Sequence, residues 1–429
     1  MSDTKVRNRW WVVIGALLVQ ICLGAIYAWG TFATVLQDGN GAHKFTETQT
    51  SIIFSITLVV FAAVMILAGR LQDKYGPRKV AITGTLVLSA GYILAGTVGG
   101  ASFVSLLIFI GIMGGAGIGL AYVCPIAACV KWFPDMKGFV TGLAVAGFGA
   151  GASLFIKFAG SWLHLLENHG VMGTMLIYGI AIAVVATIGG ALLCNPPESW
   201  KPKNWDPAKH AKGAAHSVVA DLTQSQIIRT PQFWMIWTSM ALTAGCGLIV
   251  IKCLKTFGQR SLIAGGAEAT TAAAAAGTAL ALYSIFNGAG RIAWGAISHK
   301  LGAKGSIMLM AALQALMMFV LFKMGGSGAA LAIAACWIGF NYGGGFSLFP
   351  LITVESFGSK NVGANYGAVF TSYGVGSVAG PVLAGMAADK LGTFTPAFVG
   401  AGIACVAATL ITAVLRPVKA KEEAMAKAA

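Results

Sequence analysis

Charge is scarce in this chain. Only 10% of its 429 residues are Asp, Glu, Lys or Arg, with 14 acids against 29 bases, and there are six histidines. Soluble globular domains carry about 25% charged residues, so this composition excludes such a fold in practice. The eight cysteines form no CxxC pair and have no histidine at zinc spacing, which argues against a disulfide framework or a zinc site. We expect no metal and no cofactor.

The features of an enzyme are missing as well. The sequence shows no nucleophile with a neighbouring base, no metal cluster and no cofactor fingerprint, and its histidines lie mostly in polar segments. We therefore expect a protein that is not an enzyme and has no catalytic residues.

Long apolar runs are what the chain does contain. Hydrophobic residues make up 57% of it and the mean hydropathy is +0.78. A helix needs about 20 apolar residues to cross a bilayer. Twelve windows qualify: 11–36, 49–69, 80–98, 103–130, 138–164, 171–194, 233–254, 272–298, 305–325, 328–352, 361–387 and 393–415. Because these runs are continuously apolar, they predict helices and not alternating barrel strands. The first run is too long for a cleaved signal peptide and is expected to be a transmembrane helix.

The distribution of Lys and Arg predicts the orientation. With the N-terminus inside, 21 of the 29 fall in cytoplasmic segments, six fall outside, and Lys157 and Arg291 lie within spans. Cationic loops stay on the cytoplasmic side, so we expect both termini in the cytoplasm of a bacterial multi-pass protein of the cytoplasmic membrane. The net charge of +15 is then explained by topology and by anionic lipid headgroups, and it does not support a nucleic-acid partner.

The middle of the chain is its most polar part. Residues 195–232 hold several prolines, five cations and three acids, with six apolar windows before them and six after. We predict an all-α membrane protein of two pseudo-symmetric six-helix bundles, at 1–194 and 233–429, joined by a cytoplasmic linker at 195–232, with a short tail at the C-terminus. In transporters of this organisation the substrate binds between the halves near the midplane.

A short loop pattern recurs in both halves. It lies between the second and third windows and again between the eighth and ninth, and a third copy runs from Gly385 to Gly392. Glycine permits a tight turn, and Asp73 can pair with a cation or a helix N-terminus. We interpret these loops as a conformational latch, and His299 in the place of an acid predicts a weaker or pH-sensitive second copy. The latch residues are Gly69, Asp73, Gly76, Arg78, Gly295, His299 and Gly302.

Arg291 is the only charged residue within residues 278–298. A guanidinium in a spanning segment costs ~3 kcal/mol on insertion scales, so such residues usually serve function and face a cavity. Arg291 therefore predicts an anion-binding site. The alternative is that its side chain snorkels to the cytoplasmic headgroups, near His299 and Lys300.

Several segments together resemble one family. The loop pattern in both halves is similar to that of the major facilitator superfamily. Five further segments resemble its oxalate:formate antiporter and monocarboxylate (lactate, pyruvate) transporter branch: NRW at 8–10, KWFPDMKG at 131–138, RTPQFW at 229–234, FNGAGR at 286–291 and NYG at 365–367. The resemblance implies secondary active transport of a small carboxylate by alternating access of two six-helix bundles, with Arg291 holding the carboxylate.

Two departures from the family pattern bear on the substrate. The oxalate carrier has a lysine about two turns after the tyrosine of NYG, where this chain has Tyr373. A dianion bound to a single arginine would have one charge buried without a partner, which costs roughly several kcal/mol of binding free energy. A monocarboxylate of the lactate or pyruvate type is therefore favoured over oxalate:formate exchange, which is the alternative. Monocarboxylate carriers also have an acid at the position of Asn287. An amide cannot carry a proton, so the coupling mode stays open.

By the same resemblance, five aromatic residues match a box around the carboxylate: Tyr27, Tyr122, Tyr342, Phe346 and Phe370. Tyrosine hydroxyls can donate to a carboxylate while the rings exclude water. Ordinary helix packing is the alternative. The full set of expected substrate-binding residues is Arg291, Asn287, Tyr122, Tyr342, Phe346, Tyr373, Tyr27, Phe370 and Ser372.

The expected partners follow from this set. They are a small carboxylate anion, protons as a candidate co-substrate and the lipid bilayer, and the protein is expected to be a monomer. A membrane sensor of carboxylates is the alternative from another functional class, although a sensor would be expected to carry a signalling domain.

Overall fold

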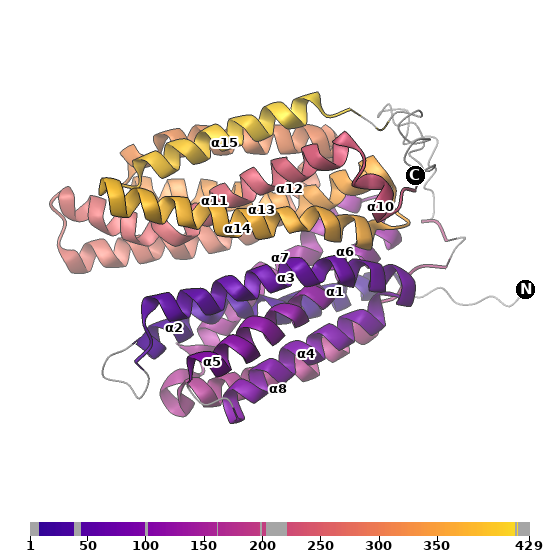
Figure 1. Ribbon diagram of the computed structural model, residues 1–429, viewed down its shortest axis with the longest axis horizontal. Helices are drawn as coiled ribbons and strands as arrows, with labels where there is room; N and C mark the ends of the chain where they lie inside the picture. The colour runs from indigo at the N-terminus through magenta and orange to yellow at the C-terminus, as the bar shows by residue number, and fades with distance from the viewer. Residues whose placement is uncertain are drawn as a thin grey trace, which may run out of the picture. The chain divides into compact units, whose positions relative to one another are not determined.

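The computed structural model describes residues 8–37, 44–98, 102–160, 162–197, 200–202, 221–416 and 418. These residues form helices joined by short turns, and no strand is assigned among them. The chain divides into two compact units, residues 1–210 and 211–429. Each unit has its own set of packed helices (Figure 1).

The first unit contains six spans, two of which are built from consecutive pieces. The first span joins α1 (Trp10–Leu23), the 3-10 turn η1 (Gly24–Ala28) and α2 (Trp29–Gln37). The fourth joins α5 (Phe103–Leu106), the π-helical η2 (Leu107–Gly114) and α6 (Gly115–Trp132). The other four are α3 (Glu47–Tyr75), α4 (Pro77–Thr97), α7 (Lys137–Ala159) and α8 (Leu165–Leu192).

Local sequence fixes where these helices begin and end. Thr46 and Gln49 form a reciprocal capping box at the start of α3, which satisfies two backbone donors that the helix itself cannot pair. Gly76 ends α3 with a φ of 83°, and Pro77 opens α4 at the position where a missing N–H costs nothing. In this unit α1 packs against α7 and α8, α4 packs against α6 and α8, and α3 packs against α6 (Figure 1).

The second unit begins with the short helix α10 (Gln224–Ile227). Its long helices are α11 (Pro231–Ala264), α12 (Ala269–Met324), α13 (Gly328–Phe357), α14 (Val362–Leu391) and α15 (Thr395–Val414). Here α12 packs against α13 and α15, and α11 packs against α14 and α15 (Figure 1).

One helix accounts for two of the predicted spans. The 56 residues of α12 would be about 84 Å long if straight, far more than the ~30 Å of a hydrocarbon core. Gly302 breaks it with a φ of 69° and a ψ of 168°, between the windows predicted at 272–298 and 305–325. Eleven helices of the described chain are long and apolar enough to cross a membrane. With α12 counted as two, the expected twelve-span all-α fold is confirmed, whereas the cytoplasmic placement of the termini stays a prediction.

Candidate functional site

Arg291 lies on the first half of α12 and its side chain is completely buried, with 0% exposure. Its Nε donates to Asn287 Oδ1 at 3.0 Å, one helical turn earlier. Its Cζ lies 4.4 Å from the centroid of the Phe346 ring on α13, within the range of a cation–π contact. A snorkelling arginine would have a solvated head, so this burial favours the anion-site interpretation.

Phe346, whose ring lies over Arg291, is itself surrounded by aromatic residues of α13 and α14. The ring of Phe346 meets Tyr342 at 5.3 Å and Tyr373 at 5.6 Å, both edge to face. Phe370 stacks on Tyr373 at 5.0 Å. The hydroxyls of Tyr342 and Tyr373 are 3.3 Å apart and share a hydrogen bond. The structure thus brings the candidates of the second unit together: Arg291, Asn287, Tyr342, Phe346, Phe370 and Tyr373.

Ser372, another predicted substrate-binding residue, forms its hydrogen bond within its own helix. It is buried, and its hydroxyl donates to the carbonyl oxygen of Val369 at 2.7 Å. That bond occupies its only donor, so Ser372 is a less suitable carboxylate ligand than the tyrosines.

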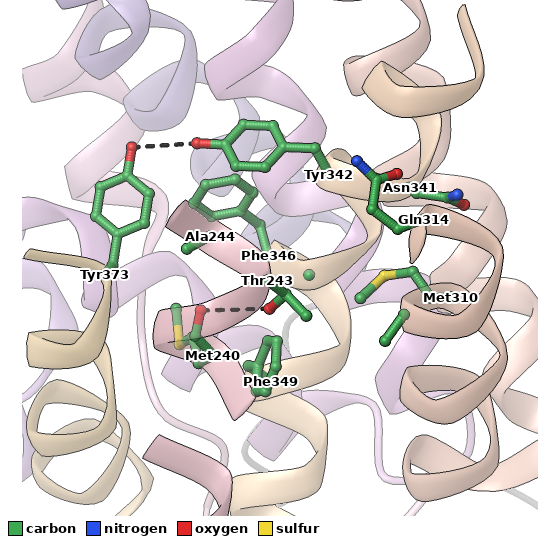
Figure 2. A pocket seen from close by; sticks show the side chains of 12 residues that line it. Met240, Thr243, Ala244, Met310, Gln314, Asn341, Tyr342, Phe346, Phe349 and Tyr373 are labelled. Atoms are coloured by element: carbon green, nitrogen blue, oxygen red, sulfur yellow. Dashed lines mark hydrogen bonds between the residues drawn. The ribbon is translucent and has the colours of Figure 1, made fainter. Parts of the chain in front are cut away.

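A cavity opens next to Tyr342, Phe346 and Tyr373 (Figure 2). Its volume is about 390 Å³. The cavity is narrow and mainly apolar. Its lining consists of Met240, Thr243, Ala244, Met310, Ala311, Gln314, Asn341, Tyr342, Gly345, Phe346, Phe349 and Tyr373.

Sequence reasoning missed three polar residues of this cavity. Thr243 lies on α11, Gln314 on the second half of α12 and Asn341 on α13. The hydroxyl of Thr243 donates to the carbonyl of Ser239 at 2.8 Å. The available signal was that Gln314 and Asn341 are amides inside the apolar windows 305–325 and 328–352, because buried polar groups in spanning helices usually mark a site.

Tyr27 and Tyr122 belong to the first unit. Their rings both meet Phe148 of α7 edge to face, at 5.3 Å for Tyr27 and 5.5 Å for Tyr122. Tyr122 is buried and also meets Phe61 at 5.1 Å. These two candidates are therefore brought together by Phe148, within a unit that does not contain Arg291.

The first copy of the latch joins helices within the first unit. Asp73 Oδ1 lies 3.5 Å from Lys131 Nζ, which connects the end of α3 to the end of α6. Arg78 Nε donates at 3.3 Å to the carbonyl oxygen of Leu193, the residue that directly follows α8. Gly69 is buried one turn before Asp73.

The second copy repeats part of this geometry. Gly302 has a φ of 69°, like the 83° of Gly76, so both turns use a backbone conformation that disfavours other residues. Lys304, two residues after Gly302, donates at 2.8 Å to the carbonyl oxygen of Leu415, the residue that directly follows α15. Gly295 is buried, and His299, at the position that Asp73 has in the first copy, is exposed.

The chain is similar in sequence to an antiporter and to a carrier of small carboxylates. The chain is 27% identical over 427 residues to the oxalate:formate antiporter of Oxalobacter formigenes, covering 97% of this chain and 95% of that protein. It is 28% identical over 484 residues to apicoplast pyruvate carrier 1 of Toxoplasma gondii, covering 91% and 86%.

The fold is also found among solved structures. The crystal structure of the E. coli fucose:proton symporter matches with a TM-score of 0.66 at 15% identity, covering 95% of this chain and 99% of that one. The family profile of the Major Facilitator Superfamily matches residues 9–262 and 254–429. The chain therefore belongs to the Major Facilitator Superfamily of membrane transporters.

Proposed function

We propose that this protein is a secondary active transporter of short monocarboxylates, of the lactate or pyruvate type, and that Arg291 binds the carboxylate. One observation carries the proposal: Arg291 is fully buried in a spanning helix and covered by Phe346, which also lines the cavity. A buried guanidinium is costly to place in a membrane, and binding an anion offsets that cost.

The absence of a second cation favours a single carboxylate. No Lys or Arg occurs among the 12 residues that line the cavity, and Tyr373 is one of them. By the family resemblance, Tyr373 stands where the oxalate carrier has its second cation. The hydroxyls of Tyr342 and Tyr373 can donate hydrogen bonds but cannot neutralise a second charge. A dianion would therefore enter with one charge unpaired.

The similarity to named carriers supports the same substrate class. One relative is named for oxalate and formate and another for pyruvate, and all three are small carboxylates. Oxalate:formate exchange is the second candidate function, favoured by the 27% identity to the antiporter over nearly the whole chain.

The proposal extends to the rest of the transport cycle. In this proposal Tyr27 and Tyr122, which both contact Phe148, are the substrate-binding residues of the first unit. The loops with Asp73 and His299 act as latches between transport states. The linker at 195–232 joins the two bundles, both termini face the cytoplasm, and the monomer is the working unit. Because Asn287 cannot carry a proton, proton coupling would use another group or the carboxyl of the substrate.

The test is uptake of radiolabelled L-lactate by proteoliposomes, with and without an inward proton gradient. Arg291→Gln is expected to reduce uptake by about 100-fold, because it removes the charge that a buried carboxylate needs. Lys252→Gln is the matched control, since Lys252 is an exposed cation on α11 of the same unit. The control should retain wild-type uptake.

Two results separate the candidate functions. Uptake that a proton gradient stimulates and that excess oxalate leaves unchanged supports proton-linked monocarboxylate transport. Uptake that needs an internal anion and is blocked by oxalate supports exchange, and would contradict the substrate argument drawn from Tyr373.

A further inference from the structure

Two buried amides line the same cavity as Tyr342 and Tyr373. Gln314 on α12 is 4% exposed and Asn341 on α13 is 3% exposed. Figure 2 shows their side chains beside each other, on the side of the cavity away from Tyr373. The cavity thus has hydroxyls on one wall and amides on another.

The hydrogen bonding of these amides is incomplete. Gln314 Nε2 donates to Cys246 Sγ at 3.6 Å. Within the described part of the chain, the buried Oε1 of Gln314 accepts no hydrogen bond and the buried Nδ2 of Asn341 donates none. Such groups are rare in native proteins because burying them unpaired is costly. One acceptor and one donor therefore lack a protein partner at the wall of a cavity.

A hydroxyl group is the simplest ligand that satisfies both atoms. Its hydrogen can be donated to Gln314 Oε1 while its oxygen accepts from Asn341 Nδ2. A keto oxygen can only accept, so it would leave Gln314 Oε1 unpaired. A methylene group would leave both amides unpaired.

We infer that Gln314 and Asn341 form a subsite for the 2-hydroxyl group of the substrate, so that the protein prefers 2-hydroxy acids to 2-oxo acids and to unsubstituted acids. This inference rests on the proposed function, in which Arg291 holds the carboxylate. The amides are neutral, so the subsite suits a hydroxyl and not a second carboxylate. Met240, Met310 and Phe349 provide the apolar surface for a short carbon chain.

The wild-type protein in proteoliposomes provides the first test. Uptake of radiolabelled L-lactate is measured in competition with unlabelled L-lactate, pyruvate and propionate, three acids of the same carbon number. We expect half-inhibition by propionate to need a concentration at least about tenfold higher than by L-lactate, with pyruvate between them. Equal inhibition by L-lactate and propionate would overturn the inference without any variant being needed.

Substitutions that keep the side-chain size but remove the amide then test whether Gln314 and Asn341 cause the preference for L-lactate over propionate. Gln314→Met and Asn341→Leu are each expected to weaken inhibition by L-lactate by about tenfold and to leave inhibition by propionate unchanged. Gln232→Met is the matched control, because Gln232 is a 5% exposed amide on α11 that does not line the cavity. If Gln314→Met weakens inhibition by L-lactate and inhibition by propionate equally, the residue is structural and the inference is wrong.

Arg291→Gln distinguishes failure of this inference from failure of the proposed function. Loss of L-lactate uptake in Arg291→Gln, together with equal inhibition of wild-type uptake by all three acids, would keep the proposed function and reject the amide subsite. Unchanged uptake in Arg291→Gln would reject the carboxylate site itself. If an amide variant does not run as a monodisperse peak in detergent, the wild-type competition decides alone.

Discussion

Arg291 shows how a charge can be kept inside a spanning helix. Two of the groups that hold it are neutral: the carbonyl oxygen of the Asn287 side chain at 3.0 Å and the Phe346 ring at 4.4 Å. Both fix the orientation of the guanidinium without cancelling its charge. Neither of these two contacts supplies a negative charge, which agrees with the proposal that Arg291 binds an anion.

At the residue scale, Tyr373 is predicted to select against dianions. Tyr373→Lys would place a second cation at the cavity, so we expect the affinity for oxalate to rise by about tenfold or more, because close buried charge pairs contribute strongly to affinity. Competition of oxalate with labelled L-lactate in proteoliposomes measures this change. Tyr373→Phe is the control, since it removes the hydroxyl bonded to Tyr342 and adds no charge. Unchanged oxalate affinity in Tyr373→Lys would show that this position does not face the substrate.

At the scale of elements, the contact between α12 and α13 positions the site. These two helices carry Arg291 and Phe346, and they approach closely where Gly343 faces the backbone of Asn287. A Cβ atom at Gly343 would collide with the carbonyl oxygen of Asn287. Close helix approach through glycine is common in membrane proteins. Here it sets the distance between Arg291 and the Phe346 ring.

The corresponding prediction concerns Gly343→Ala. The added methyl group would force α12 and α13 apart, and we expect a loss of stability of about 1–3 kcal/mol, the usual cost of overpacking. Thermal unfolding of the purified protein in detergent measures the change. Gly288→Ala is the control, because a Cβ at Gly288 on the neighbouring helix α12 meets nothing within 4 Å. Equal melting of the two variants would mean that the close approach does not limit stability.

At the scale of the whole molecule, the two units repeat one design. Arg78 donates a hydrogen bond to the carbonyl oxygen of Leu193, just after the last span of the first unit. Lys304 donates one to the carbonyl oxygen of Leu415, just after the last span of the second unit. Each cation lies two residues after a glycine with positive φ, Gly76 or Gly302. The repeat in sequence is therefore also a repeat of interactions.

The orientation of this repeat in the membrane is the prediction at the same scale. If both termini are cytoplasmic, green fluorescent protein fused to the C-terminus is expected to fluoresce in a bacterial host, and alkaline phosphatase fused after Gly266, between α11 and α12, is expected to be active. The reason is the concentration of Lys and Arg in alternate segments. The opposite result for both fusions would show that the termini lie outside the cytoplasm and would contradict the predicted orientation.

Much of this architecture could be predicted from the sequence, because a span in lipid must be a long apolar segment with its backbone bonds made internally. The break at Gly302 was visible for the same reason, since it separates two windows of membrane length. The amides Gln314 and Asn341 were not recognised as a pair, because they lie 27 positions apart on different helices and only the packing of α12 against α13 and α11 places both at one cavity.

The sequence by itself determined the number of spans and the family, and it singled out Arg291 as a candidate, because hydropathy, loop motifs and a lone charge are properties of single segments. The tertiary structure alone decided that Phe346 covers Arg291, that Tyr373 shares a hydrogen bond with Tyr342, and that two amides meet the same cavity. These contacts join side chains from separate helices, and their distances depend on helix rotation and close approach, which no local pattern encodes.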